Sequence, residues 1–367
     1  MGFGPVIAQD AARMRTGPSR LTAQNHGLDL LRGLAAFGVA VYHFLEWRLK
    51  IQVQSLGTFS VYIFFVLSGL TMIMVYGNRF AGGITLRDAA DFYRNRVARL
   101  MPLLIVVGVC RLLVDFSSGS FSDIGPRLIR FFLTVSGAFA LQLPGFLSST
   151  TGAWSLGIEC GFYLVFPLAA LAAMNSQPRL LVAITAFLVA CQQFVMVLIR
   201  DFDTAAFWNY YITNASFAPF FAFGFLIFRL SKNCQTLNPL WFLVVFGIIC
   251  VFSIVVPHID LFRSPVYYLG LSAMAASCVW LAYRTNIPPV IAPFCFTFGS
   301  ISYGLYLTHW LSDIIAYKFT KFLGGSLYVE FPLFVFISVA GAYASFRLLE
   351  SPARAALKRR KLGLHTP

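Results

Sequence analysis

Long hydrophobic runs, separated by short polar segments, recur along this chain from Leu28 onward. A run of about 20 residues lets an α-helix cross the roughly 30 Å of a bilayer's hydrocarbon core. The pattern therefore predicts an all-α bundle of ten transmembrane helices. Their expected ranges are 28–48, 57–76, 101–116, 153–174, 180–199, 208–228, 239–257, 265–283, 297–317 and 327–347.

Residues 128–144 are also hydrophobic, but they are short, and they leave the number of crossings open. Lys and Arg collect in cytoplasmic loops. If this segment does not cross, 18 of the 28 basic residues share one side and 8 the other; if it crosses, the split is 12 to 14. We therefore expect ten crossings with both termini cytoplasmic, and a partly buried excursion over 116–152 on the opposite side. The domains are then a cytoplasmic tail at 1–27, a membrane domain at 28–349 and a basic cytoplasmic tail at 350–367.

Composition agrees with a lipid environment. Hydrophobic residues make up 58% of the 367 positions and charged residues 11%, whereas soluble domains carry about 25% charged residues. The net charge of +14 follows from the basic loops, so nucleic acid is not an expected partner. The seven cysteines are scattered singly, without metal-ligand or redox spacing, and no metal site is expected. No cleavable signal peptide is visible in the polar residues 1–26.

The first hydrophobic run contains three ionisable residues, which are costly inside a membrane and often functional. Arg32 and His43 are eleven residues apart, about three helical turns, so they share a face about 16 Å apart along the axis. Asp29 lies one turn before Arg32 and could pair with it. In the alternative interpretation, Asp29 and Arg32 form an interfacial anchor and His43 is a satisfied buried histidine.

Three arginines precede Pro102 on the expected cytoplasmic side: Arg94, Arg96 and Arg99. Arg96 and Arg99 share a helix face, and guanidinium groups suit a ligand with several phosphates. The alternative is a basic loop that only orients the protein in the membrane.

Two further runs carry polar residues. Glu159 follows Trp154 by little more than one turn, and its carboxylate among hydrophobic neighbours suits proton transfer; the alternative is an interfacial tryptophan belt with an acid that reaches the surface. Ser302, Tyr306 and His309 form a polar stripe, which could also serve only to bond neighbouring helices.

These residues stand in an ordered series of motifs. The series is Leu28-Asp29-Leu30-Leu31-Arg32-Gly33-Leu34-Ala35-Ala36 leading to Tyr42-His43-Phe44, Phe64-Phe65-Val66-Leu67-Ser68-Gly69, Arg96-x-x-Arg99-x-x-Pro102, Trp154-Ser155-Leu156-x-x-Glu159-x-x-Phe162-Tyr163, Ser302-Tyr303-x-x-Tyr306-Leu307-x-His309 and Glu350-Ser351-Pro352. With these motifs the chain resembles the acyltransferase-3 family of integral membrane acyltransferases over residues 28–352. One departure is Cys160-Gly161, where the family more usually has a polar pair.

The resemblance implies a cytoplasmic acyl-CoA donor, with acetyl-CoA as substrate and no permanently bound cofactor. It implies a glycan acceptor, either a lipid-linked oligosaccharide or an exported polysaccharide such as an exopolysaccharide, and a place in the lipid bilayer of the bacterial cytoplasmic (inner) membrane. Polysaccharide-assembly proteins are possible partners. Larger family members append an extracytoplasmic hydrolase-like domain. This sequence ends 15 residues after Pro352, so we expect it to complete the transfer alone or to pass the acyl group to another protein.

The expected roles combine the pattern and the resemblance. We expect His43 to act as general base or, alternatively, to carry the acyl group, with Glu159 orienting it or binding the sugar. The full expected set is His43, Glu159 and Arg32 for catalysis, Arg94, Arg96 and Arg99 for acyl-CoA, and Asp29, Trp154, Ser155, Tyr303, Tyr306 and His309 lining the acceptor site. The competing function is a glycan transporter or flippase that relays protons through intramembrane histidines. The missing internal repeat is evidence against it.

Overall fold

The computed structural model describes residues 25–117, 124–141, 148–231, 236–255 and 263–356. Most of both expected tails, 1–27 and 350–367, lies outside these residues. The regular elements described are helices, with one isolated β-bridge between Leu237 and Thr285. They are α2 (His26–Phe44), η1 (Leu45–Leu49), α3 (Gln54–Phe80), α4 (Leu86–Ser117), α5 (Ile124–Ser136), η2 (Ala138–Leu141), α7 (Ala153–Asn175), α8 (Pro178–Ile199), α9 (Thr204–Tyr211), α10 (Asn214–Leu230), α11 (Pro239–Val255), α13 (Pro265–Arg284), α14 (Ala292–Phe322), α15 (Leu327–Ser345) and η3 (Phe346–Glu350).

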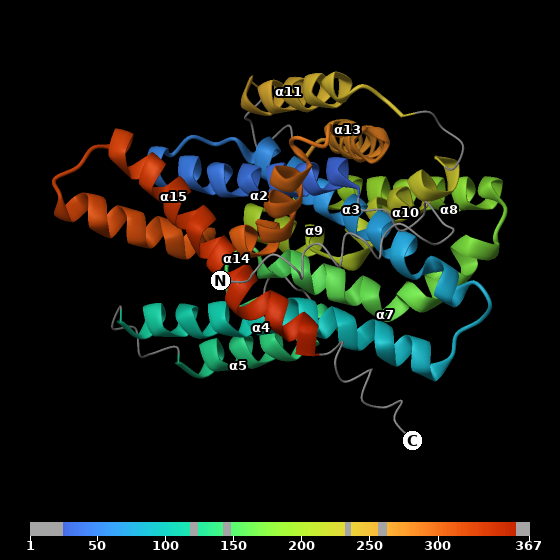
Figure 1. Cartoon of the computed structure of the whole chain (residues 1–367), viewed down its shortest axis with the longest axis horizontal. Coiled ribbons are helices and arrows are strands. Elements are labelled where there is room, and N and C mark those ends of the chain that lie inside the picture. The colour runs from blue at the N-terminus through green and yellow to red at the C-terminus, as the bar shows by residue number, and fades with distance from the viewer. Residues whose placement is uncertain (1–24, 118–123, 142–147, 232–235, 256–262, 357–367) are drawn as a thin grey trace, which may run out of the picture.

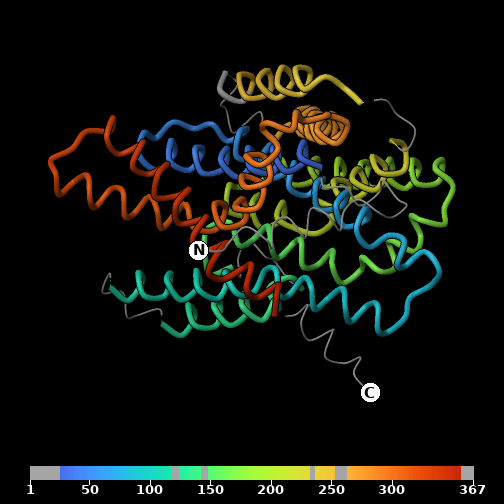
Figure 2. Tube along the Cα trace, viewed as in Figure 1, coloured from blue at the N-terminus to red at the C-terminus, as the bar shows by residue number. Residues whose placement is uncertain are grey.

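The helices form one bundle, and most of them run roughly along the horizontal direction of Figures 1 and 2. The connection between α3 and α4 lies at the right-hand end and the connection between α14 and α15 at the left-hand end (Figure 1). In the predicted topology these two connections lie on opposite sides of the membrane. Helix α2 packs against both α14 and α3, so the helix that carries Arg32 and His43 lies inside the bundle.

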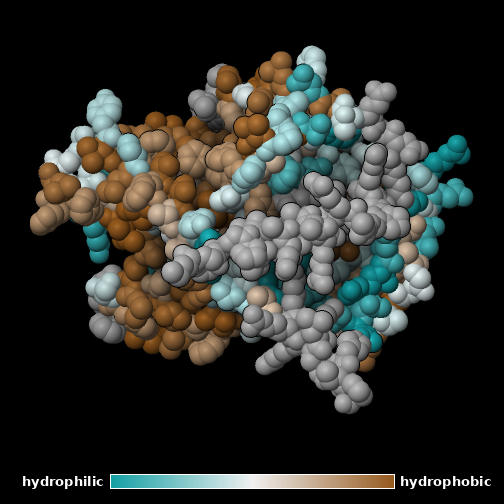
Figure 3. All heavy atoms as spheres, viewed as in Figure 1, coloured by the Kyte–Doolittle hydropathy of each residue, from teal (hydrophilic) through white to brown (hydrophobic). Residues whose placement is uncertain are grey.

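The surface of the bundle fits a lipid environment. Hydrophobic side chains gather over the left-hand and central parts of the face in Figure 3, and hydrophilic ones gather at its right-hand end. Individual large hydrophobic side chains turn outward, among them Phe187 of α8 and Phe336 of α15, which are 66% and 70% exposed. Exposed hydrophobic side chains gathered over such a broad surface are rare on a soluble protein and ordinary where lipid is the solvent.

Seven helices of the described chain are long and apolar enough to cross a membrane, and the bent pair α9 and α10 makes eight if it is one span. The chain is thus an all-helical integral membrane protein, while the number of ten crossings stays a prediction. Two of the ten predicted spans fall outside this set. The apolar part of α11 is shorter than a full span, and α14 has 31 residues but carries the polar stripe of the expected site, which lowers its hydropathy.

The ambiguous segment forms α5 and the short helix η2, and α5 packs against α4. The 13 residues of α5 extend about 20 Å, less than the hydrocarbon core of a bilayer. A short helix against a longer one fits the expected excursion over 116–152, whose side of the membrane stays a prediction.

A close contact between α2 and α14 builds the centre of the site. A Cβ atom on Gly299 of α14 would lie 2.7 Å from the Cα atom of Asp29, closer than two non-bonded carbon atoms approach in proteins. Small residues let helices pack this tightly inside a membrane. The contact brings the polar stripe of α14 against the Arg32–His43 face of α2.

Candidate functional site

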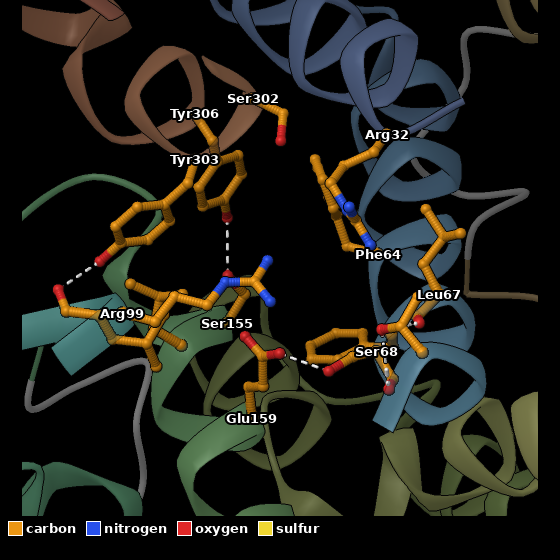
Figure 4. Close-up of a pocket in the computed structure, with 14 residues that line it drawn as sticks. Arg32, Phe64, Leu67, Ser68, Arg99, Ser155, Glu159, Ser302, Tyr303 and Tyr306 are labelled. Atoms are coloured by element: carbon orange, nitrogen blue, oxygen red, sulfur yellow. Dashed lines mark hydrogen bonds between the residues drawn. The ribbon is translucent and has the colours of Figure 1, made fainter. Parts of the chain in front are cut away.

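The first feature of the site is a cavity between α2, α3, α4, α7 and α14, which we name the inner cavity (Figure 4). Its volume is about 70 Å³. It is lined by Arg32, Phe64, Phe65, Leu67, Ser68, Thr71, Arg99, Leu100, Ser155, Leu156, Glu159, Ser302, Tyr303 and Tyr306. The fold therefore gathers, from four helices, six of the residues that the sequence selected.

Three charged side chains meet in the inner cavity. The guanidinium groups of Arg32 and Arg99 point into it from different helices, and the carboxylate of Glu159 lines the same cavity (Figure 4). Glu159 accepts a hydrogen bond from Ser68 Oγ. Asp29 Oδ1 lies 3.8 Å from Arg32 Nη1, so the predicted Asp29–Arg32 ion pair is confirmed. Two cations and one carboxylate in the lining make the cavity suited to an anionic group of a ligand.

Tyr306 closes one end of the inner cavity through its hydroxyl group. That hydroxyl lies 2.8 Å from Ser155 Oγ and 3.0 Å from the carbonyl oxygen of Gly152. Gly152 has φ of +80°, and a Cβ atom on it would lie 3.1 Å from the Tyr306 ring. A residue other than glycine would therefore be strained there and would press on the ring. The turn before α7 is shaped to hold Tyr306 in place.

Replacing Tyr306 with phenylalanine is expected to lower the free energy of unfolding by about 1–2 kcal/mol, because a buried pair of hydrogen bonds is lost. The measurement is unfolding of the purified protein by titration with a denaturing detergent. Tyr328→Phe is the matched control, since Tyr328 is 91% exposed and should unfold like the wild type. Equal stability of the two variants would contradict a structural role for the Tyr306 hydroxyl.

Tyr306 also lines a second cavity, which we name the middle cavity, with a volume of about 170 Å³. The middle cavity is lined by Val39, Tyr42, His43, Gln54, Gly57, Thr58, Val61, Tyr62, Gly152, Trp154, Trp208, Tyr211, Ile212 and Tyr306. One side chain thus separates the arginines of the inner cavity from His43.

A third cavity, the outer cavity, has a volume of about 450 Å³. It is lined by His43, Gly108, Arg111, Leu112, Asp115, Arg127, Arg130, Ser148, Ser149, Thr150, Thr151, Gly152 and Trp154. It shares His43, Gly152 and Trp154 with the middle cavity. Arg99 lines the inner cavity and Arg111 lines the outer cavity. The two residues are twelve positions apart on α4, which corresponds to about 18 Å along the helix axis. The three cavities therefore form a row across the bundle, joined at Tyr306 and at His43.

His43 lies in a stack of aromatic rings. Its ring centroid is 4.7 Å from that of Trp47 and 5.0 Å from that of His309, which is fully buried. His309 Nδ1 lies 2.7 Å from the backbone oxygen of Tyr306; because a carbonyl only accepts, this nitrogen carries a proton. His309 is thus a positioned neighbour of His43 and lines none of the three cavities.

The carboxylate beside His43 is that of Glu46, whose Oε2 lies 3.6 Å from His43 Nδ1. The sequence interpretation gave Glu159 the task of orienting His43 or binding sugar. The structure places Glu159 in the lining of the inner cavity with Arg32 and Arg99, one cavity away from His43, so Glu159 does not orient His43. Its binding of sugar stays a prediction. Glu46 was missed, although its position three residues after a membrane histidine was a usable signal.

The three arginines before Pro102, predicted to be cytoplasmic, have different partners. Arg94 pairs with Asp91 at 2.5 Å, and Arg96 donates to the Tyr76 hydroxyl at 3.1 Å with its guanidinium over the Tyr76 ring. Arg99 alone lines the inner cavity. The sequence placed Arg96 and Arg99 on one helix face. In the structure the guanidinium group of Arg96 packs against the rings of Tyr76 and Tyr163 from neighbouring helices.

A buried charge cluster at the other end of α14 was also missed. Arg48 donates to both carboxylate oxygens of Asp313, at 2.9 and 2.6 Å, and its Nε lies 3.0 Å from Glu330 Oε1. Arg48 stands at the end of the first predicted span and was not among the residues selected from the sequence. Asp313, one turn after His309, was a signal that could have been used. Among the described residues, no three His, Cys, Asp or Glu side chains come together as metal ligands.

Comparison with known proteins gives one family and one relative. The sequence matches a family described as "Acyltransferase domain" (acyltransferase 3) over residues 25–347. It is 25% identical over 355 residues to YrhL of Bacillus subtilis strain 168, which is provisionally named a peptidoglycan O-acetyltransferase. The alignment covers 89% of this chain and 54% of the relative, so the chain spans about half the length of the curated relative it matches. No solved structure matches it.

Proposed function

This chain belongs to the acyltransferase 3 family, and from that membership we propose that it moves an acetyl group from cytoplasmic acetyl-CoA to a hydroxyl group of a glycan. The observation that carries the proposal is the row of three cavities with His43 at a junction. A donor bound at one end of the row and an acceptor at the other would meet at this imidazole.

The inner cavity is proposed to receive the donor. Arg32 and Arg99 supply the positive charge that the phosphates of CoA require, and Arg94 and Arg96 lie earlier on the same helix, toward the predicted cytoplasmic end. The rise from Arg32 to His43, about 16 Å, is close to the reach of an extended pantetheine arm. Because the inner cavity holds about 70 Å³, side chains must move when the arm enters, and Tyr306 is the side chain that separates it from His43.

His43 is proposed as the general base. Glu46 beside Nδ1 favours a proton on that nitrogen and leaves Nε2 free to accept one. The acceptor hydroxyl gives its proton to Nε2 while its oxygen bonds to the thioester carbonyl carbon. The carbon–sulfur bond then breaks, and CoA leaves as the thiol with the proton that His43 returns. The products are the ester and free CoA.

The acceptor is proposed to be a polysaccharide or its lipid-linked precursor at the bacterial cytoplasmic membrane. The name of the Bacillus relative supports both a polysaccharide acceptor and an acetyl group. Trp154 and the hydroxyl groups of residues 148–151 line the outer cavity, and sugars bind to such combinations of an aromatic ring and polar groups.

Replacing Arg99 with glutamine is expected to raise KM for acetyl-CoA by about 10- to 100-fold, because a charge-assisted contact to phosphate contributes about 1.5–3 kcal/mol. The measurement is the initial rate of transfer against acetyl-CoA concentration. Arg94→Gln is the matched control, since Arg94 is already paired with Asp91 and should change KM little. An unchanged KM in Arg99→Gln would remove Arg99 from the donor site.

The proposed function is tested in inverted membrane vesicles that expose the cytoplasmic face. Acetyl-CoA labelled in the acetyl group is added, and label is followed into base-labile ester on glycan. We expect incorporation that depends on this protein. Vesicles that contain the folded protein and their native glycan but incorporate no label above the level of vesicles without it would contradict the proposal.

A further inference from the structure

The outer cavity is lined by several charged side chains. Its described lining contains three arginines, Arg111, Arg127 and Arg130, and a single carboxylate, Asp115. Asp115 is shared, at 3.1 Å from Arg111 and 3.4 Å from Arg127. Counted over these described lining residues alone, there are three positive charges and one negative charge. A cavity of this charge attracts anions more strongly than neutral sugars.

Uncommitted hydroxyl groups lie in the same lining. Ser149 Oγ and Thr150 Oγ1 are buried and have no hydrogen-bond partner among the described residues. Thr150 is 6% exposed. A buried polar group without a partner costs free energy unless a ligand or water supplies one. Two such hydroxyls beside an indole and three guanidinium groups make a built site for a polar ligand.

The size and position of the outer cavity fit an acceptor rather than the donor. Its volume of about 450 Å³ is within the range of small-molecule sites. Its Arg111 lies about 18 Å along α4 from Arg99 of the inner cavity. His43 and Trp154 reach it from the side of the middle cavity.

On these observations, and resting on the proposed function, we propose that the outer cavity binds an anionic glycan. The acceptor would present a carboxylate or phosphate oxyanion to Arg127 and Arg130, stack on Trp154 and place a hydroxyl group against His43. Two sources offer this chemistry: an acidic sugar of the glycan itself, or the diphosphate that links a glycan to a polyprenyl carrier. Both require the same arginines.

The test measures equilibrium binding to the full-length protein in lipid nanodiscs. One pair of probes is a glucuronate-containing tetrasaccharide and the same tetrasaccharide with its carboxyl groups reduced to alcohols. The other pair is a sugar joined to a short prenyl diphosphate and the same sugar joined to the prenyl alcohol. We expect at least one anionic probe to bind about tenfold more tightly than its neutral partner. The first pair identifies an acidic sugar as the source and the second a carrier diphosphate.

The variant Arg127→Gln/Arg130→Gln is expected to lose that tenfold advantage and to bind acetyl-CoA like the wild type. The matched control Arg200→Gln/Lys321→Gln removes two charges from exposed positions outside the outer cavity and should keep the advantage. Equal binding of the anionic and neutral probes by the wild type, or no binding of either, would overturn the inference without the need for a folded variant. So would a loss of acetyl-CoA affinity in the cavity variant.

This outcome is separate from that of the proposed function. Vesicles that acetylate glycan while the purified protein shows no anionic preference would overturn the anionic site and keep the transferase. A clear anionic preference in a protein whose vesicles transfer no label would keep the binding site and overturn the transferase.

Discussion

Replacing His43 with alanine is expected to reduce acetyl transfer by about 100- to 10,000-fold, the range that a positioned general base contributes. His43 lines both the middle and the outer cavities. Its ring also stacks with those of Trp47 and His309. With the imidazole gone, nothing in its place takes the proton of the acceptor hydroxyl. The measurement is incorporation of labelled acetyl into glycan ester by vesicles that hold equal amounts of each protein.

The control for this prediction is donor binding. Because Arg32 of the inner cavity lies about 16 Å from His43 along α2, and Arg99 lines the inner cavity but neither cavity that His43 lines, His43→Ala should bind acetyl-CoA within about twofold of the wild type. His43→Gln, which keeps most of the side-chain volume in the stack, should be as inactive as the alanine variant. Transfer at the wild-type rate by either variant would show that another group is the base.

Replacing Arg48 with alanine is expected to give a large loss of stability, about 3–5 kcal/mol in the free energy of unfolding. The change leaves Asp313 and Glu330, whose side chains are 7% and 11% exposed, without the cation they share. Two buried carboxylates next to each other then repel or must take up a proton. The measurement is unfolding by a denaturing detergent, with transfer activity measured on the fraction that remains folded.

Two variants distinguish unpaired buried charge from lost packing as the cause of this loss of stability. Arg48→Met combined with Asp313→Asn and Glu330→Gln removes every charge of the cluster and should regain most of the lost stability. Arg79→Ala is the matched surface control, because Arg79 also faces two acids, Asp88 and Asp91, but is 36% exposed. It should cost less than about 1 kcal/mol. A triple variant as unstable as Arg48→Ala would point to lost packing instead.

Much of the fold was predictable because membrane insertion depends on each segment by itself. The ten hydrophobic runs correspond to the long helices of the structure, with α9 and α10 sharing one run. The positions of the two helix-face pairs also followed from the 3.6-residue period: Asp29 does lie beside Arg32, and Arg32 and His43 both line cavities. The apolar part of α11 and the polar α14 show where hydropathy alone is a weak guide.

The partners of the site residues were less predictable. Glu159 lies with Arg99 instead of His43, and Arg96 packs on Tyr76 outside the inner cavity. Arg48 meets Asp313 across 265 positions of sequence. Nothing in the spacing along one helix states which face of another helix it will meet.

The sequence by itself thus determined that the chain is a bundle of membrane helices with the motifs of an acyltransferase, because hydrophobic length and residue identity are properties of single segments. Only the tertiary structure decided that these motifs open onto three cavities in a row, that Arg48 meets Asp313 and Glu330, and that arginines from two helices line the outer cavity. Those arrangements depend on helix packing distances of a few ångströms, which close contacts such as that of Gly299 with Asp29 set between segments far apart in the chain.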